Sequence, residues 1–111
     1  AQEEVVGPVL AIIPFENDEE AIEIANGTIY GLAAGVWTQS ITRALTMSQK
    51  LKAGTVWMNT YRAVSYMSPF GGFKRSGIGR ESGLSAIREY LQEKSVWIDI
   101  SGSVPNPFVQ R

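Results

Sequence analysis

Cysteine and histidine are both absent from the 111 residues of this chain. Without cysteine the chain has no thiol nucleophile and cannot form a disulfide framework. Without histidine it cannot build a Ser-His-Asp arrangement, and most transition-metal sites lose their usual ligands. We therefore expect neither thiol catalysis, nor a Ser-His-Asp arrangement, nor a metal site in this chain.

A strong net charge and a long apolar run are missing as well. Ten basic and eleven acidic residues leave a net charge of −1, so the chain has no basic surface for nucleic acid and no polybasic patch for a membrane. No apolar stretch approaches the length of a membrane-spanning helix, and the N-terminus lacks the pattern of a secretory signal. We expect a cytoplasmic protein whose partners include neither nucleic acid nor membranes.

Short apolar runs alternate with amphipathic segments along the first half of the chain. Residues 9–15, 32–38 and 55–59 have the composition of covered strands. Helices are expected after Asn17 and after Ser40, because both residues are good N-caps. This order predicts an α/β fold, a layered βαβαβ unit with a three-stranded parallel sheet. At this length the chain forms one domain that can bury a modest core.

Local signals predict where both helices begin and end. Asn17 is the expected N-cap of the first helix, with Glu20 as its capping-box partner. Asn26-Gly27 is the expected stop, since both residues tolerate the left-handed conformation. The second helix is expected to run from Ser40 to a stop at Gly54. Its predicted apolar face consists of Ile41, Ala44, Leu45, Ser48 and Leu51.

Residues 68–83 form a glycine-dense segment after the third strand. Five glycines in sixteen residues permit close approach to another chain segment or a ligand, and such loops usually shape a site or a surface. Phe70 and Phe73 flank the first glycine pair, which predicts a pocket wall. Residues 77–83 are similar to a dinucleotide-binding fingerprint, but the third glycine comes one residue late and no strand precedes the first. We therefore interpret this segment as a loop shaped for packing.

The last part of the chain is predicted to contain a third helix and a further strand. Leu84, Ile87 and Leu91 mark the apolar side of the helix. The alternation from Ser95 to Ile100 is typical of a strand. Such a strand could pair with the edge of the domain's own sheet or with the sheet of another subunit, and the residues alone leave both possibilities open. Residues 101–111 are expected to form an extended or poorly ordered arm.

The chain carries four ordered motifs that resemble the carboxyl-terminal part of the NAD(P)-dependent aldehyde dehydrogenase superfamily. They are Gln2-Glu-Glu-Val-Val-Gly-Pro-Val9, Tyr30-Gly-Leu-Ala33, Gly54-Thr-Val-Trp-Met-Asn59 and Ser68-Pro-Phe-Gly-Gly-Phe-Lys-Arg-Ser-Gly77. The resemblance implies that residues 1–94 are the C-terminal part of the catalytic domain, and that residues 95–111 are an oligomerisation strand with a C-terminal arm running to a natural carboxyl end. It also implies that the nucleophile, the general base and the dinucleotide-binding fold lie upstream.

The same resemblance implies roles for individual residues. Glu4 matches the glutamate that hydrogen-bonds the nicotinamide ribose, and a carboxylate suits two hydroxyls at once. Val6 takes the place of the family's phenylalanine beside the nicotinamide, which keeps an apolar wall but loses the area of the ring. Phe70 matches the aromatic residue that lines the aldehyde tunnel. Val64 and Tyr66 belong to the loop, residues 59–67, that shapes substrate preference.

The implied reaction is oxidation of an aldehyde to a carboxylic acid with NAD or NADP, which needs a cysteine thiolate. Because this chain has none, we expect it to be inactive alone and to bind no cofactor alone. Its implied partners are the missing upstream part of the enzyme and a second subunit bound through residues 95–100. Separated from them, it should expose apolar surface and self-associate. The alternative is a stand-alone, non-catalytic binding or oligomerisation module derived from that family.

Overall fold

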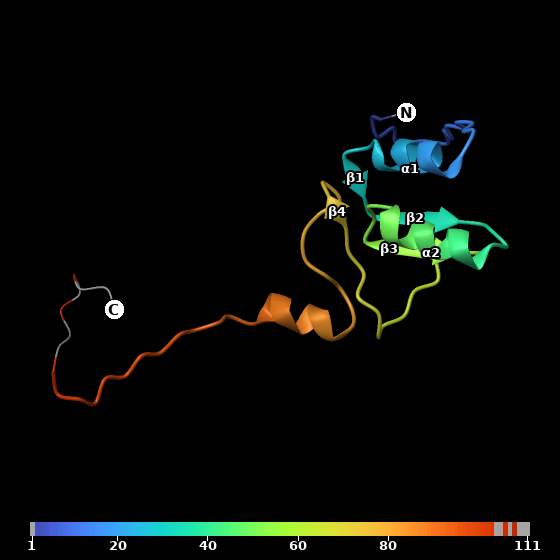
Figure 1. Cartoon of the computed structure of the whole chain (residues 1–111). Coiled ribbons are helices and arrows are strands. Elements are labelled where there is room, and N and C mark those ends of the chain that lie inside the picture. The colour runs from blue at the N-terminus through green and yellow to red at the C-terminus, as the bar shows by residue number, and fades with distance from the viewer. Residues whose placement is uncertain (1, 104–105, 107, 109–111) are drawn as a thin grey trace.

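The structure, a computed structural model, describes residues 2–103, 106 and 108. Figure 1 shows that the helices and strands of residues 18–74 lie together, and that a short helix followed by an extended segment leads away from them. The element order is α1 (Asp18–Asn26), β1 (Tyr30–Gly31), β2 (Ala33–Val36), α2 (Ile41–Lys50), β3 (Thr55–Met58), β4 (Phe73–Lys74) and the 3-10 helix η1 (Leu84–Tyr90). Within the described part of the chain, no helix is both long enough and apolar enough to cross a bilayer.

Helix α1 begins where the capping signal predicts. The side chain of Asn17 accepts a hydrogen bond from the backbone N–H of Glu20 at 2.9 Å, and the Glu20 carboxylate accepts one from the N–H of Glu16 at 2.7 Å. The predicted N-cap is therefore confirmed, whereas the predicted capping box is wrong in its second bond, because Glu20 accepts from Glu16 and not from the N–H of the N-cap residue Asn17. The helix also ends at the predicted place, but the left-handed stop is wrong. Gly27 has φ −71° and closes a tight right-handed last turn.

Helix α2 connects β2 to β3, and these two strands form a parallel pair with their four residues in register (Figure 1). The predicted cap is confirmed, since the Ser40 hydroxyl accepts from the backbone N–H of Arg43 at 3.3 Å. The predicted stop at Gly54 is wrong, because the helix already ends at Lys50. There the side-chain amide of Asn26 donates to the Lys50 carbonyl at 2.9 Å and accepts from the next free N–H, that of Lys52, at 2.8 Å. These bonds satisfy the backbone after the last turn.

The second sheet is an antiparallel pair that the sequence did not reveal. Strand β1 pairs with β4, so that the glycine-dense segment returns to the start of β2. The hydroxyl of Ser76 accepts a hydrogen bond from the N–H of Gly31 at 2.9 Å, just beyond this pairing. Lys74 continues the link to α1, because its Nζ donates to two backbone carbonyls at the end of that helix, each at 2.9 Å. Side chains and short strands therefore join segments that lie far apart in the sequence.

The predicted three-stranded parallel sheet is wrong at its first strand. Residues 9–15 form no strand and have no ladder partner among the described residues, and Ile12 is 85% exposed. The parallel sheet consists of β2 and β3 alone. An apolar run indicates that a segment is to be covered, but it does not say which segment covers it. Nothing in the described chain covers this one.

The predicted C-terminal helix and strand differ from the structure in a similar way. The helix is present as η1, but its turns are 3-10, and Leu84 and Leu91 on its apolar side are exposed. Residues 95–100 are not a strand, since they pair with no other described segment. They continue as an extended trace, and Trp97 is 92% exposed (Figure 1). Of the predicted arm, residues 104–105, 107 and 109–111 lie outside the described residues.

The buried core is smaller than a self-sufficient domain requires. In the described part of the chain it consists of three apolar side chains, Ala44, Met47 and Leu51, while Ile41 and Leu45 of the predicted α2 face are exposed. The accessible surface is 10193 Å², whereas a compact monomer of this mass exposes about 6,100 Å². The radius of gyration is 22.1 Å, against about 13 Å for a compact domain of this length. The expected modest core is therefore wrong, and the expected exposure of apolar surface is confirmed.

Candidate functional site

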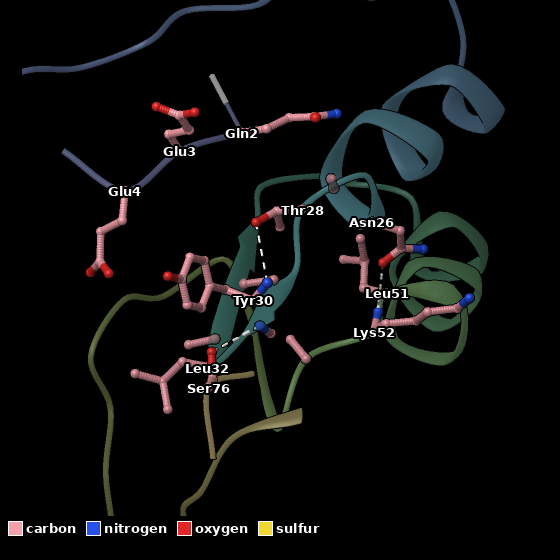
Figure 2. A pocket seen from close by; sticks show the side chains of 15 residues that line it. Gln2, Glu3, Glu4, Asn26, Thr28, Tyr30, Leu32, Leu51, Lys52 and Ser76 are labelled. Carbon is pink, nitrogen blue, oxygen red and sulfur yellow. Dashed lines mark hydrogen bonds between the residues drawn. The ribbon is translucent and has the colours of Figure 1, made fainter. Parts of the chain in front are cut away.

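Two pockets contain the residues that the sequence singles out. The first, which we call the carboxylate pocket, lies between the N-terminal segment, the end of α1 and strands β1 and β2, and has a volume of about 420 Å³. Figure 2 shows Gln2, Glu3 and Glu4 along one side of it, with their side chains pointing in different directions. Its lining residues are Gln2, Glu3, Glu4, Ala25, Asn26, Thr28, Tyr30, Gly31, Leu32, Ala33, Ala34, Leu51, Lys52, Ala53 and Ser76.

The inner wall of the carboxylate pocket is held by polar bonds from side chains to the backbone. The Asn26 amide joins the end of α1 to the end of α2, and the Thr28 hydroxyl accepts from the N–H of Tyr30 at 3.2 Å. Ser76 ties the same wall to the glycine-dense segment (Figure 2). These side chains are engaged, whereas the polar side chains of the N-terminal segment, the Tyr30 hydroxyl and the Lys52 ammonium have no hydrogen-bond partner among the described residues.

Glu4 lies in this pocket, and Val6 does not. The Glu4 side chain is exposed, and its carboxylate has no hydrogen-bond or ion-pair partner among the residues that the structure describes. A free carboxylate can accept hydrogen bonds from two hydroxyls of a sugar. Val6 is 96% exposed and does not line this pocket. The structure therefore does not bring the two expected cofactor residues together, and their roles stay predictions.

The second pocket, which we call the loop pocket, brings together all three expected substrate residues. It has a volume of about 350 Å³ and contains Val64, Tyr66 and Phe70. Phe70 is partly buried, whereas Val64 and Tyr66 are largely exposed, so one side of the pocket is open. Its remaining lining residues are Thr55, Ala63, Ser65, Ser68, Pro69, Glu81 and Ser82. The gathering agrees with a common apolar wall, although the role of each residue stays a prediction.

Backbone pairing fixes the inner wall of the loop pocket. Phe70 and Glu81 form an isolated antiparallel bridge in which each N–H donates to the other's carbonyl at 2.8 Å. The N–H of Gly83 donates to the carbonyl of Tyr66 at 2.8 Å. Glu81 consequently places an acidic side chain beside the apolar wall. Sequence reasoning missed Glu81, because only the bridge brings it next to Phe70.

Arg80 holds the glycine-dense segment in its folded-back course. Its guanidinium donates to the carbonyl of Gly72 at 3.0 Å and to that of Gly79 at 2.6 Å, and it lies over the ring of Phe73 at 5.5 Å. Phe73, which belongs to β4, therefore packs against Arg80 and lines neither the carboxylate pocket nor the loop pocket. The predicted pocket wall is confirmed for Phe70 and wrong for Phe73.

Neither pocket contains a thiol or an imidazole. Cysteine and histidine are missing from the whole sequence, and the described residues include no cluster of potential metal ligands. The clearest electrostatic perturbation is remote from both pockets. There the Ser101 hydroxyl and N–H donate to the carboxylate of Asp99 and hold its pKa below the usual 3.8.

Comparison with known proteins gives one consistent result. The model of the "Aldehyde dehydrogenase family" matches residues 1–96. The chain is 50% identical over 109 residues to the (Z)-2-((N-methylformamido)methylene)-5-hydroxybutyrolactone dehydrogenase of Acinetobacter baylyi, which covers 97% of this chain and 22% of that protein. It is 54% identical over 96 residues to an aldehyde dehydrogenase of Emericella nidulans, with coverage of 86% and 19%. The chain thus spans about a fifth of the length of the curated relatives it matches.

Solved structures resemble this chain over most of its length. The NAD+ complex of an aldehyde dehydrogenase from Bacillus cereus matches 89% of the chain with a TM-score of 0.81 and 54% identity, using 20% of its own length. A betaine aldehyde dehydrogenase from Staphylococcus aureus, a double mutant in complex with NAD+, matches 98% of the chain with a TM-score of 0.86 and 43% identity, using 22% of its length. Because the second match includes nearly the whole chain, the open and extended course seen in Figure 1 recurs within a much longer chain.

Proposed function

Since this chain belongs to the aldehyde dehydrogenase family, we propose that it is the carboxyl-terminal part of an NAD(P)-dependent aldehyde dehydrogenase, an enzyme that oxidises an aldehyde to a carboxylic acid in the cytoplasm. One observation carries the proposal. The chain keeps the backbone course of a complete enzyme over nearly its whole length, yet it exposes far more surface than a compact monomer of its size. A segment with that shape is completed by other parts of a larger protein.

The first proposed role is a contact with the cofactor. The free carboxylate of Glu4 fits the two hydroxyls of a nicotinamide ribose, because each oxygen can accept one hydrogen bond. Val6, exposed two residues further on, fits an apolar contact with the nicotinamide ring. When bound, the dinucleotide supplies the acceptor for the hydride that leaves the aldehyde carbon. This chain offers a carboxylate and one apolar side chain, so the rest of the cofactor site has to come from upstream residues.

The second proposed role is one wall of the aldehyde site. Val64, Tyr66 and Phe70 surround the loop pocket and present apolar surface to its open side. An apolar wall favours the hydrocarbon part of an aldehyde and keeps water away from the reacting carbon. The nucleophilic thiol and the general base belong to the upstream part, which agrees with the absence of cysteine here.

The third proposed role is assembly. Residues 95–100 form an extended segment with exposed apolar side chains and no backbone partner among the described residues. Such a segment can add to the edge of a neighbouring sheet, where its N–H and C=O groups would be paired. We propose that it joins a sheet of a second subunit. The reason is that the extended course leads it away from the sheets of its own chain (Figure 1).

A chimeric enzyme tests the proposal directly. In the Bacillus cereus aldehyde dehydrogenase, the matching 20% of the chain would be replaced by this sequence, and NADH formation with an aliphatic aldehyde would be recorded. The chimera should be active, and the isolated 111-residue chain should form no NADH. A Glu4→Gln chimera should show a KM for the cofactor about ten-fold higher, because a charge-assisted hydrogen bond is lost. Glu19→Gln is the matched control, because this carboxylate is exposed on α1 and lines neither pocket.

The same experiment separates the enzyme segment from a stand-alone module. A folded chimera without activity would contradict the proposed role in the enzyme. An isolated chain that is monomeric, unfolds cooperatively and binds NAD would support the autonomous module instead. We expect neither outcome, because a single ribose contact does not offset the cost of fixing a flexible cofactor.

A further inference from the structure

The loop that supplies Val64 and Tyr66 to the loop pocket is fastened to strand β3 by one aromatic side chain. The indole N–H of Trp57 donates to the backbone carbonyl of Ala63 at 2.7 Å. The ring of Tyr61 stands edge-on to the Trp57 ring, with 5.6 Å between centroids and an interplanar angle of 73°. Both contacts join residues only a few positions apart, so they fold the loop back upon the strand that precedes it.

We propose that Trp57 is a positioning residue for the loop pocket. Its N–H fixes the carbonyl immediately before Val64, and therefore sets where the apolar wall begins. The acceptor is a backbone group, so the bond locates the loop regardless of the side chain at position 63. The far end of the loop is fixed separately, because Gly83 donates to the carbonyl of Tyr66. Between the two anchors the wall has little freedom.

The start of the loop is also fixed, but by a residue outside the pocket. Asn59 has φ +54°, and its side-chain amide exchanges two hydrogen bonds of 2.8 Å with the backbone of Thr38. These two hydrogen bonds hold the first residue of the loop against Thr38, just after the end of β2. They do not reach the pocket wall, because residues 60–62 lie in between. Trp57 therefore controls the part of the loop that Asn59 leaves free.

The part of the inference that concerns substrate binding rests on the proposed function. The part that concerns the anchoring of the loop rests on the structure alone. The test uses Trp57→Phe in the natural full-length polypeptide, because phenylalanine keeps an aromatic ring and loses the N–H. Tyr61→Leu is a second variant that removes the edge contact and leaves Trp57 intact. Trp37→Phe is the matched control, since Trp37 is exposed and lines neither the carboxylate pocket nor the loop pocket.

Two readouts separate anchoring from catalysis. The exposed Arg62 lies inside the loop, so trypsin cleavage after Arg62 reports how often the loop opens. Loss of the indole bond should raise that cleavage rate about five-fold. In steady-state kinetics, KM for hexanal should rise about five-fold with kcat little changed. KM for acetaldehyde should barely change, because acetaldehyde is too short to contact the apolar wall. Tyr61→Leu should shift both readouts in the same direction, and Trp37→Phe should shift neither.

Each result decides part of the inference. An unchanged cleavage rate in Trp57→Phe would overturn the anchoring role, whatever the enzyme's activity. Faster cleavage with an unchanged ratio of the two KM values would overturn the positioning of the pocket. A full-length wild-type protein with no aldehyde activity would refute the proposed function, while the cleavage rates would still decide whether Trp57 anchors the loop.

Discussion

Replacing Gly72 by alanine tests whether the glycine-dense segment closes as the structure has it. Gly72 is buried, and its carbonyl is one of the two acceptors of the Arg80 guanidinium. A methyl group at Gly72 would lie 2.6 Å from the Cβ, the carbonyl carbon and the carbonyl oxygen of Ser76, whereas ordinary contact begins at 3.4 Å. Ser76 would have to move by about 0.8 Å, the difference between these distances. Two of the three crowded atoms are backbone, so a side-chain rotation cannot relieve the overlap.

The cost follows from what Ser76 holds in place. Its hydroxyl accepts from the N–H of Gly31 at 2.9 Å, and its own N–H donates to the carbonyl of Phe73 at 3.1 Å. Overpacking of this kind costs about 1–3 kcal/mol, and one weakened hydrogen bond adds about 1 kcal/mol. The alanine also reduces the conformational entropy of the unfolded chain, which stabilises the folded protein by about 0.4–1 kcal/mol and offsets part of this loss. We therefore expect Gly72→Ala to lower the free energy of unfolding by about 2–3 kcal/mol.

Thermal unfolding of the full-length polypeptide measures this effect. A loss of that size lowers Tm by about 4–12 °C in a domain of 150–250 residues. Gly35→Ala is the matched control, because its methyl group would meet only the ring of Trp37, at 3.0 Å, and that exposed side chain can turn away. The control should change the free energy of unfolding by less than about 1 kcal/mol. If Gly72→Ala melts no lower than Gly35→Ala, the loop does not close at Ser76 and the reasoning is refuted.

Three further outcomes are expected. Asn17→Ala should lower the free energy of unfolding by about 1 kcal/mol in denaturant titrations, because alanine lacks a capping oxygen. Asn17→Ser, which keeps one, should retain most of that stability. Equal stability of the two variants would contradict the cap. Asp18→Asn removes the negative charge that Arg43 Nε meets at 2.7 Å. It should cost no more than about 1 kcal/mol at low salt and less at high salt, since both side chains are partly exposed. A salt-independent loss would count against this. The isolated chain should self-associate, so its mass in light scattering should rise with concentration, and a monomer at every concentration would be evidence for a self-sufficient fold.

The sequence by itself determined the locally encoded parts of this protein. The caps at Asn17 and Ser40 lie within three residues of the N–H groups they satisfy, and β3 was recognisable as a short apolar run. The motifs indicated the aldehyde dehydrogenase family, whose model matches residues 1–96, and the sequence also shows that the chain has no cysteine. These features need no knowledge of distant contacts, so a single chain reveals them.

Only the tertiary structure decided which distant segments meet. The pairing of β1 with β4, the bridge that brings Glu81 beside Phe70, and the bond from Trp57 to the loop all depend on where the chain turns back. The exposed courses of residues 9–15 and 95–100 were equally beyond prediction, because an apolar or alternating pattern states that a segment needs a partner and not whether this chain contains one. Burial is a property of two surfaces, and among the described residues these two segments meet no second surface.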